Sequence, residues 1–324
     1  MRRLLLIAVI ALTMTSCEYF MAPGIEVEPK LYMVAVGIGY EHSRINDLAY
    51  TKADLNALVA QMESLLSGKM DYEILSLSDE EEGFTLGRHT AKGIEEIKKY
   101  DSDKLMTKEE FKEIFTEGFT SKPETNDILI FYYAGHGYDK TGSLVYTYRY
   151  GTSVYGTLSS RDFYDDIISL FKCRKLLLLD SCYSGNFIEE GDLASTIFYS
   201  EDGDVFLSGF NLFSSLGDSF SSLSSSNNAR PDVFVISAAG RDQLSYENVG
   251  GVRHGLFTHA LLEYLDYDTD MEEARFTSKF DGKSVSVADL YRGIVDNFPI
   301  RDYKRKSTPN TTASKYDMVV FDFR

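Results

Sequence analysis

The sequence is poor in cysteine, in basic residues and in long hydrophobic runs. Its 324 residues include three cysteines, and 33 Lys and Arg face 50 Asp and Glu, for a formal net charge of −17. This acidic excess argues against binding to nucleic acid or to anionic membrane patches, and it would attract cationic substrates. The thiols and imidazoles also lack the paired spacing of a zinc site, so the residues predict no metal and no cofactor.

The scarcity of cysteine excludes a disulfide framework. Cys173 and Cys182 flank one apolar run, and as the two ends of a strand they would lie about 30 Å apart at ~3.3 Å per residue. A disulfide requires a Cα separation below about 7 Å. Cys182 is therefore predicted to remain a thiol, and Cys173 to be a buried bystander.

The N-terminus carries a short hydrophobic run, Leu4 to Leu12, directly after Arg2 and Arg3. This pattern predicts a signal peptide over residues 1–16, because the run is too short to span a bilayer. Residues 14–17, Met-Thr-Ser-Cys, resemble a lipobox with Met in place of the usual Leu. The resemblance implies lipidation of Cys17, a polar tether over 17–29 and an exported lipoprotein anchored at the bacterial cell envelope. Ordinary secretion with a free Cys17 is the alternative.

Two apolar runs end in residues that carry chemistry. Lys175 to Leu179 continues into Asp180, Ser181 and Cys182, and Asp127 to Ala134 continues into Gly-His136-Gly. Such runs are typical of strands buried on both faces of a parallel sheet, whose carboxyl ends hold the ligand sites of open α/β folds. The sequence therefore predicts that Cys182 and His136 meet at one edge of a sheet.

A thiol beside an imidazole points to acyl transfer. The imidazole can take the thiol proton and later protonate the leaving group. The backbone amides of Gly137 and Cys182 are the predicted donors to the oxyanion, since the glycines around His136 allow close backbone approach. We expect Cys182 and His136 to be the catalytic residues.

Residues 133–137, Tyr-Ala-Gly-His-Gly, and 179–185, Leu-Asp-Ser-Cys-Tyr-Ser-Gly, resemble the caspase-like cysteine peptidases, closest to bacterial metacaspase-type members. Further similarity lies at 33–40 with Asp54, at 236–247 and at 254–258. The resemblance implies a three-layer α/β sandwich whose mostly parallel sheet has about six strands and helices on both faces. It assigns 30–324 to one peptidase domain, with a large-subunit-like part (30–183), a linker (184–231) and a small-subunit-like part (232–324).

Acidic residues near the nucleophile predict the substrate. Asp180 precedes Cys182 by two residues, so it can face the pocket, and the resemblance places Asp54 in the same pocket. Two carboxylates would hold the basic side chain of an Arg or Lys that precedes the scissile bond. Asp242 is a candidate third acid at the rim. The alternatives are that Asp180 caps a turn and that Asp54 is a solvated acid at a helix start.

Other features receive structural interpretations. His42, His89, His254 and His259 are predicted to be packed or exposed, and Gly37 with Gly39 lacks the remaining residues of a nucleotide loop. Residues 79–82 are predicted to form a solvated loop, and 94–100 a short helix. Helix N-caps are expected at Thr107, within a capping box, at Ser160 and at Ser286. Residues 138–156 hold a single carboxylate, Asp139, which predicts activity without calcium.

Two functions follow from the sequence. The first is a cysteine endopeptidase that cleaves proteins or peptides after basic residues. The second is a catalytically silent caspase-like domain that binds a partner at the envelope. The presence of both Cys182 and His136 favours the enzyme.

Overall fold

The computed structural model describes residues 28–81, 83–101, 103–138, 141–188, 197–199, 205–207, 232–300, 303, 306–312 and 317–324. The predicted signal peptide, the lipidation site Cys17 and Asp139 lie outside these residues, as do all of the tether but its last two residues and most of the linker. None of the helices in the described part combines the length and the apolar character needed to cross a membrane.

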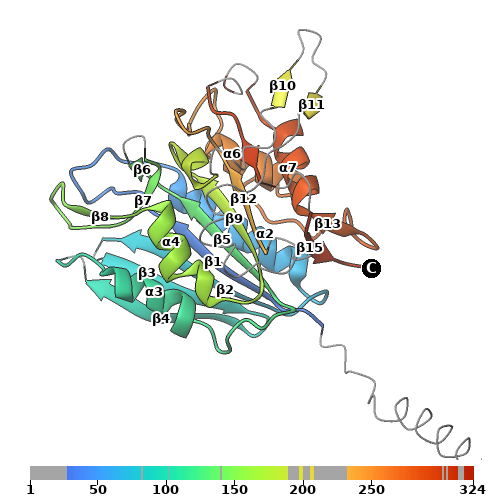
Figure 1. The fold of residues 1–324 in the computed structure, drawn as a ribbon, viewed down its shortest axis with the longest axis horizontal. Coiled ribbons are helices and arrows are strands. Elements are labelled where there is room, and N and C mark those ends of the chain that lie inside the picture. The colour runs from blue at the N-terminus through green and yellow to red at the C-terminus, as the bar shows by residue number, and fades with distance from the viewer. Residues whose placement is uncertain are drawn as a thin grey trace, which may run out of the picture.

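An eight-stranded sheet forms the centre of the fold (Figure 1). Its five inner strands, from β12 to β2, run parallel, and the strands at both edges are antiparallel. The mostly parallel α/β sheet is as predicted. The predicted number of about six strands was wrong, because a hairpin extends one edge of the sheet and a two-residue strand extends the other. In spatial order the strands are β14 (Asn310–Thr311), β12 (Val233–Ser237), β9 (Arg174–Asp180), β5 (Ile128–Ala134), β1 (Leu31–Gly37), β2 (Tyr72–Glu80), β3 (Gly83–Thr90) and β4 (Gly93–Asp101).

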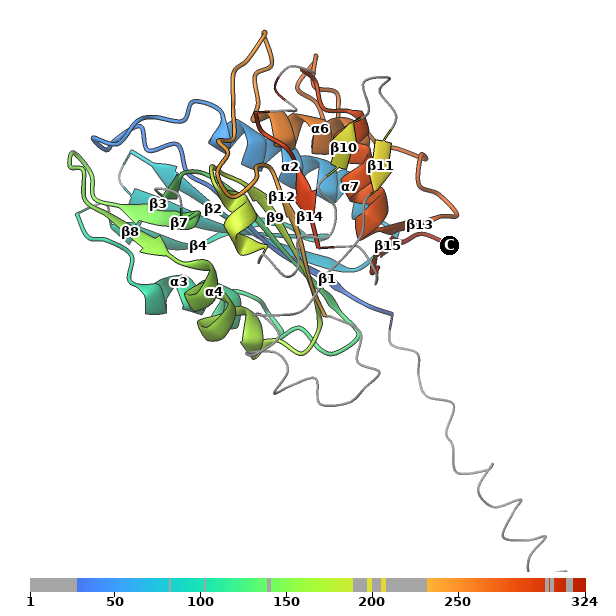
Figure 2. The same ribbon diagram turned by 45° about the horizontal axis from the view of Figure 1, so that its top comes forward.

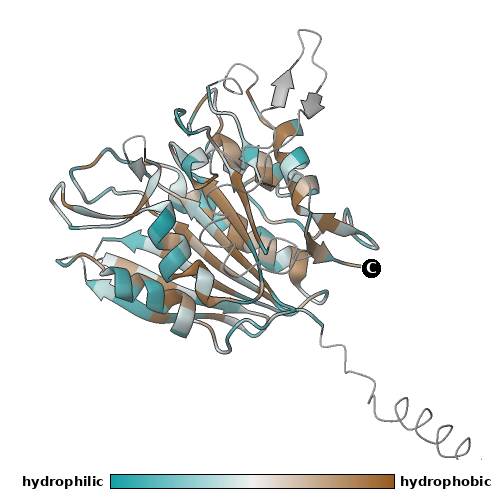
Figure 3. Cartoon of the chain, in the orientation of Figure 1, coloured by the Kyte–Doolittle hydropathy of each residue, from teal (hydrophilic) through white to brown (hydrophobic). Residues whose placement is uncertain are grey.

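Helices cover both faces of this sheet, which gives the three predicted layers (Figure 2). Successive side chains of a strand point to opposite faces, so Met33 packs into one core and Val34 into the other. Figure 3 shows the inner strands as the most hydrophobic part of the chain. The first core lies under α2 (Thr51–Leu66), α6 (Leu256–Tyr264) and α7 (Val287–Asp296), and the second under α3 (Lys108–Glu117) and α4 (Ser160–Asp166).

Helix starts follow the capping signals in the sequence. Thr107 Oγ1 accepts the Glu110 amide at 3.1 Å, and Glu110 Oε2 accepts the Thr107 amide at 2.8 Å, which confirms the capping box of α3. Ser286 caps α7 in the same way. The cap of α4 is Ser159 rather than the predicted Ser160, because Ser159 has the extended backbone that lets its hydroxyl accept the Asp162 amide.

The segment predicted as a short helix at 94–100 is a strand, β4. It pairs with β3 as an antiparallel hairpin, and Gly83 and Gly93, with φ of 136° and 129°, begin the two strands. Tyr100 packs into the core while Ile94 is exposed. Backbone pairing with a neighbouring strand therefore outweighs the local helical tendency of this charged segment.

The solvated loop predicted at 79–82 is also wrong at its first residues, because Asp79 and Glu80 belong to β2. Asp79 is buried, and its carboxylate accepts the amides of Gly39 at 2.9 Å and Tyr40 at 2.8 Å and the hydroxyl of Tyr148 at 3.0 Å. Three donors satisfy the buried charge, so Asp79 fixes the loop that follows β1.

Smaller sheets surround the central one. An antiparallel hairpin is formed by β7 (Ser143–Tyr148) and β8 (Tyr155–Leu158), and β6 (Gly137–Tyr138) pairs with the other edge of β7. The last strand, β15 (Val319–Asp322), pairs with β13 (Ser284–Ser286) outside the central sheet. Within the predicted linker lie the 3₁₀ helix η2 (Ser184–Phe187) and the pair β10 (Ile197–Tyr199) and β11 (Val205–Leu207).

Candidate active site

Cys182 lies in the turn that ends β9, as predicted. The strand stops at Asp180, and Tyr183 adopts the left-handed conformation, with φ of 58°, that turns the chain into η2. Cys182 Sγ lies 3.8 Å from the carbonyl oxygen of Ser245, to which the thiol donates. Burial, together with the charge of Asp180, raises the pKa of Cys182, so the resting residue is a thiol rather than a thiolate.

His136 lies directly after β5 with a defined tautomer. Its Nε2 is 2.6 Å from the carbonyl oxygen of Asn46, and since a carbonyl only accepts, Nε2 carries the proton and Nδ1 is the basic nitrogen. Burial lowers the pKa of His136, which the Asn46 contact opposes only in part. The neutral ring can therefore accept a proton.

Two tyrosines hold His136 in place. The Tyr40 ring lies 4.6 Å from the imidazole, and the Tyr40 hydroxyl accepts the His136 amide at 3.1 Å. The Tyr133 hydroxyl donates to the His136 carbonyl at 2.9 Å. The backbone and the ring of His136 are thus both fixed by buried aromatic residues.

The His136 and Cys182 loops touch through their backbones. A Cβ atom added to Gly137 would lie 1.8 Å from the Cys182 carbonyl oxygen, so only glycine fits there. Gly135 donates its amide to the Asp180 carbonyl at 3.3 Å. The sheet therefore brings together the two residues predicted to be catalytic, although the hydrogen bonds of the His136 ring and the Cys182 thiol go to Asn46 and Ser245 and not to each other.

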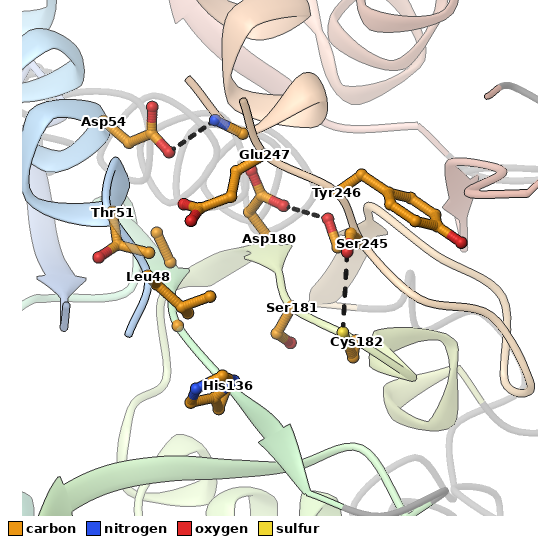
Figure 4. Close-up of a pocket in the computed structure, with 13 residues that line it drawn as sticks. Leu48, Thr51, Asp54, His136, Asp180, Ser181, Cys182, Ser245, Tyr246 and Glu247 are labelled. Carbon is orange, nitrogen blue, oxygen red and sulfur yellow. Dashed lines mark hydrogen bonds between the residues drawn. The ribbon is translucent and has the colours of Figure 1, made fainter. Parts of the chain in front are cut away.

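A pocket opens between these loops (Figure 4). Asp54, Asp180, His136 and Cys182 all line it, so four of the predicted site residues share one cavity. The complete lining is Leu48, Thr51, Asp54, Ala134, Gly135, His136, Asp180, Ser181, Cys182, Ser245, Tyr246, Glu247 and Gly255. Asp242 is exposed and is not among these residues.

Asp180 is held by donors from two other segments. Its Oδ1 accepts the Ser245 hydroxyl at 2.6 Å, and its Oδ2 accepts the Thr258 hydroxyl at 2.7 Å and the Thr258 amide at 3.2 Å. Because the Thr258 hydroxyl donates to Asp180, the Tyr132 hydroxyl, 2.7 Å away, donates to Thr258. Burial raises the pKa of Asp180 despite these bonds.

Asp54 points into the pocket from the first turn of α2. Its Oδ1 lies 2.6 Å from His254 Nδ1, and its Oδ2 accepts the Gly255 amide at 3.0 Å. A Cβ on Gly255 would lie 2.3 Å from Asp180 Oδ2 and 3.1 Å from Asp54 Oδ2, so the two carboxylates converge on this glycine. Burial raises the pKa of Asp54 to about 7; the hydrogen bond from His254 opposes this rise and the charge of Asp180 adds to it.

The sequence reasoning missed several residues that line the pocket or support its acids. Ser245 and Thr258 orient Asp180, Glu247 adds a third carboxylate, and His254 contacts Asp54. The signal that could have found them is their position in 236–247 and 254–258, the two segments that carried the family resemblance. In the described part of the chain, no three His, Cys, Asp or Glu side chains form a group that could hold a metal ion.

Comparison with known proteins identifies the family. The model described as the caspase domain matches residues 33–317. No curated protein sequence matches the chain.

Three solved structures are similar in fold. A Geobacter sulfurreducens protein shares 17% identity at a TM-score of 0.44, with coverage of 91% of this chain and 95% of that one. A secreted C11 cysteine protease from Bacteroides thetaiotaomicron, solved with an irreversible peptide inhibitor, shares 13% identity at a TM-score of 0.42, with coverage of 83% of this chain and 57% of that one. Caspase-1 from Spodoptera frugiperda shares 11% identity at a TM-score of 0.40, with coverage of 87% of this chain and 83% of that one. Because the caspase-domain model spans nearly all of the described residues, the chain belongs to the caspase-domain family of cysteine peptidases.

Proposed function

We propose that this protein is an endopeptidase in which Cys182 is the nucleophile and His136 the general base and acid. The observation that carries the proposal is that both residues line one pocket together with two buried carboxylates. His136 Nδ1 takes the thiol proton, and the thiolate attacks the scissile carbonyl carbon. The Gly137 and Cys182 amides stabilise the resulting oxyanion.

The reaction then proceeds by ordinary acyl transfer. As the peptide C–N bond breaks, His136 returns its proton to the leaving amine and a thioester remains on Cys182. His136 next removes a proton from water as its oxygen attacks the thioester carbon. The C–S bond then breaks, the acid product leaves, and the Cys182 thiolate takes the proton back from His136. In the resting state the thiol donates to the Ser245 carbonyl, and it must leave this partner to react.

We assign the pocket to an Arg or Lys side chain that precedes the scissile bond. Asp54 and Asp180 supply two carboxylates beside Cys182, and Glu247 supplies a third. Burying like charges together is costly until a cation arrives, which favours a basic side chain over a neutral one and repels an acidic one. The net charge of −17 acts in the same direction on the approach of cationic substrates.

The test is covalent labelling with peptidyl electrophiles that end in Arg, Lys or Asp. We expect the Arg and Lys probes to modify the wild type but not Cys182→Ala, and the Asp probe to modify neither. Labelling of Cys182→Ala would contradict the assignment of the nucleophile. A complete lack of labelling would instead favour the silent binding domain.

We also propose that a lipid on Cys17 anchors the protein at the bacterial cell envelope. The support is the lipobox-like run 14–17 after a charged and then apolar N-terminus. Cells that produce the wild type should incorporate labelled fatty acid into a protein of the membrane fraction. Cys17→Ser should abolish the incorporation of fatty acid and the recovery of the protein in the membrane fraction. A Cys17→Ser protein that remains in the membrane fraction would contradict the lipid anchor.

A further inference from the structure

A second group of charged side chains contacts Asp54 outside the lining of the pocket. His254 is 1% exposed, and its two ring nitrogens face two carboxylates. Nδ1 is 2.6 Å from Asp54 Oδ1, and Nε2 is 3.1 Å from Glu272 Oε2. The contact with Glu272 has the distance of an ion pair but not the alignment of a hydrogen bond. Only a protonated imidazole has a proton on each nitrogen to offer two carboxylates.

Glu272 is presented to His254 by a built loop. Glu272 has φ of 57°, a conformation that costs a residue other than glycine ~1 kcal/mol or more and that the surrounding structure must maintain. Asp268 and Glu273 close the loop with two reciprocal backbone hydrogen bonds of 2.9 and 3.1 Å. The Asp268 carboxylate also accepts the Met271 amide at 2.9 Å. The hydrogen bonds of the loop therefore hold the Glu272 carboxylate in place despite its unfavourable backbone conformation.

The electrostatic need for His254 follows from burial. Asp54 and Asp180 are both buried and converge on Gly255, so each opposes ionisation of the other. Burial alone lowers the pKa of His254, but the hydrogen bond and charge of Asp54 and the charge of Glu272 outweigh it and raise the pKa. The other charged and titratable groups around Asp54 and His254 are Tyr132, Asp180, Glu247, His259, Tyr267 and Glu272. Arg253, which is exposed, lies 3.6 Å from Glu272.

We propose that His254, held by Glu272, is a positioning residue that keeps Asp54 ionised and aimed into the substrate pocket. The inference rests on the proposed function in that Asp54 binds the basic side chain of the substrate. His254 does not touch substrate, and it acts only through Asp54.

The test measures KM for an Arg substrate as a function of pH in the wild type and in His254→Asn. In the wild type, KM should fall as pH rises through about 7, because Asp54 is neutral below its raised pKa and anionic above it. His254→Asn keeps an N–H donor near Nδ1 but removes the charge, so the pKa of Asp54 should rise further. We expect KM at pH 7 to increase about tenfold, the scale of one charge-assisted contact, with a small change in kcat and with the fall in KM moved to higher pH.

Matched variants separate this role from simple packing. Glu272→Gln should shift the profile in the same direction but less, and it serves also if His254→Asn fails to fold. Arg292→Gln removes an exposed positive charge on α7, outside this group of residues, and should leave the profile unchanged. An unchanged profile in both His254→Asn and Glu272→Gln, where Asp54→Asn does raise KM, would overturn the role of His254 alone. If Asp54→Asn leaves KM unchanged, the substrate assignment fails instead.

A second measurement is independent of peptidase activity. The ¹⁵N chemical shifts of the imidazoles should report His254 as doubly protonated at pH 7 in the wild type and neutral in Asp54→Asn. His259 is an internal control, because burial lowers its pKa and it should be neutral throughout. A neutral His254 in the wild type would overturn the proposal whether or not any peptide is cleaved.

Discussion

Asp180 receives three hydrogen bonds from Ser245 and Thr258, so its carboxylate has one orientation before any substrate binds. A pre-oriented acid loses little conformational freedom on binding and therefore contributes mainly to affinity. Asp54, by contrast, has a partner that titrates, because its Oδ1 faces His254. The two acids of the pocket thus differ, because neutral donors fix the orientation of Asp180 whereas the partner of Asp54 can change its charge.

Replacing Asp180 by Asn should weaken the binding of basic substrates. The amide keeps the shape of the side chain but removes one charge from the pocket, so KM for Arg and Lys peptides should rise about tenfold or more while kcat changes little. Steady-state kinetics on a pair of Arg and Lys peptides would measure this. Asp242→Asn removes an exposed acid outside the pocket and is the control. An equal rise in KM for both variants would point to the net charge of the protein rather than to the pocket.

Tyr40→Phe should lower kcat more than it raises KM. The hydroxyl accepts the His136 amide and donates to the Val145 carbonyl at 2.6 Å, so its loss leaves buried polar groups unpaired and loosens the base. The free energy of unfolding should fall by about 1–3 kcal/mol. Urea unfolding and steady-state kinetics test the two effects. Tyr150→Phe, an exposed ring stacked on His42, should change neither, and a kcat in Tyr40→Phe equal to the wild type would contradict the role of Tyr40.

Helix α2 begins without a side-chain cap of its own. Tyr50 occupies its N-cap without a side-chain hydrogen bond, although the free amides of a helix start need acceptors. Glu247 supplies one, because its carboxylate accepts the Ala49 amide at 2.8 Å and the Tyr50 amide at 3.2 Å from 198 and 197 residues away. The loop that carries Ser245 is thereby tied to the helix that carries Asp54.

Two cap variants should separate stability from substrate binding. Glu247→Ala should cost about 2 kcal/mol of unfolding free energy and raise KM for basic peptides, because it frees the start of α2 and removes a pocket acid. Thr107→Ala removes the capping box of α3, which lies on the opposite face of the sheet, and should cost about 1 kcal/mol without a change in KM. Chemical unfolding and kinetics on both variants give the comparison. A rise in KM for Thr107→Ala would show that general destabilisation, not the tie, controls binding.

The distance along the chain between interacting residues explains which elements could be predicted from the sequence. The apolar runs of β5 and β9, the Cys182 and His136 that follow them, and the Thr107 cap are encoded within a few residues, and each prediction agrees with the structure. Asp79 and Glu247 depend on partners distant in the sequence, whereas β4 forms by pairing with β3, the strand directly before it. Asp79 serves amides 40 and 39 residues away, so local composition described it only as an acidic loop.

At the scale of the whole molecule, acidic residues outnumber basic ones by 50 to 33. Within the described ranges no three His, Cys, Asp or Glu side chains form a group that could hold a metal ion, and calcium needs six or more oxygen ligands, several of them anionic. The excess of negative charge is therefore expected to act on substrates at long range rather than to build an ion site.

Peptidase activity should accordingly persist without calcium. Removal of divalent ions with a chelator should leave kcat/KM for an Arg peptide unchanged, because no step of the proposed mechanism requires a metal. Adding back calcium and, separately, magnesium controls for general ionic effects on this acidic protein. Activity that the chelator abolishes and that calcium alone restores would contradict the prediction.

The separation of Asp54 from Gly255 along the chain has a consequence for the timing of activity. The carboxylate at 54 is fixed by the amide of a residue 201 positions later, and Asp180 is fixed by Thr258. A growing polypeptide that already contains Cys182 and His136 therefore still lacks the wall of its substrate pocket. If the proposed function holds, a chain that stops before Gly255 should therefore lack activity on basic peptides.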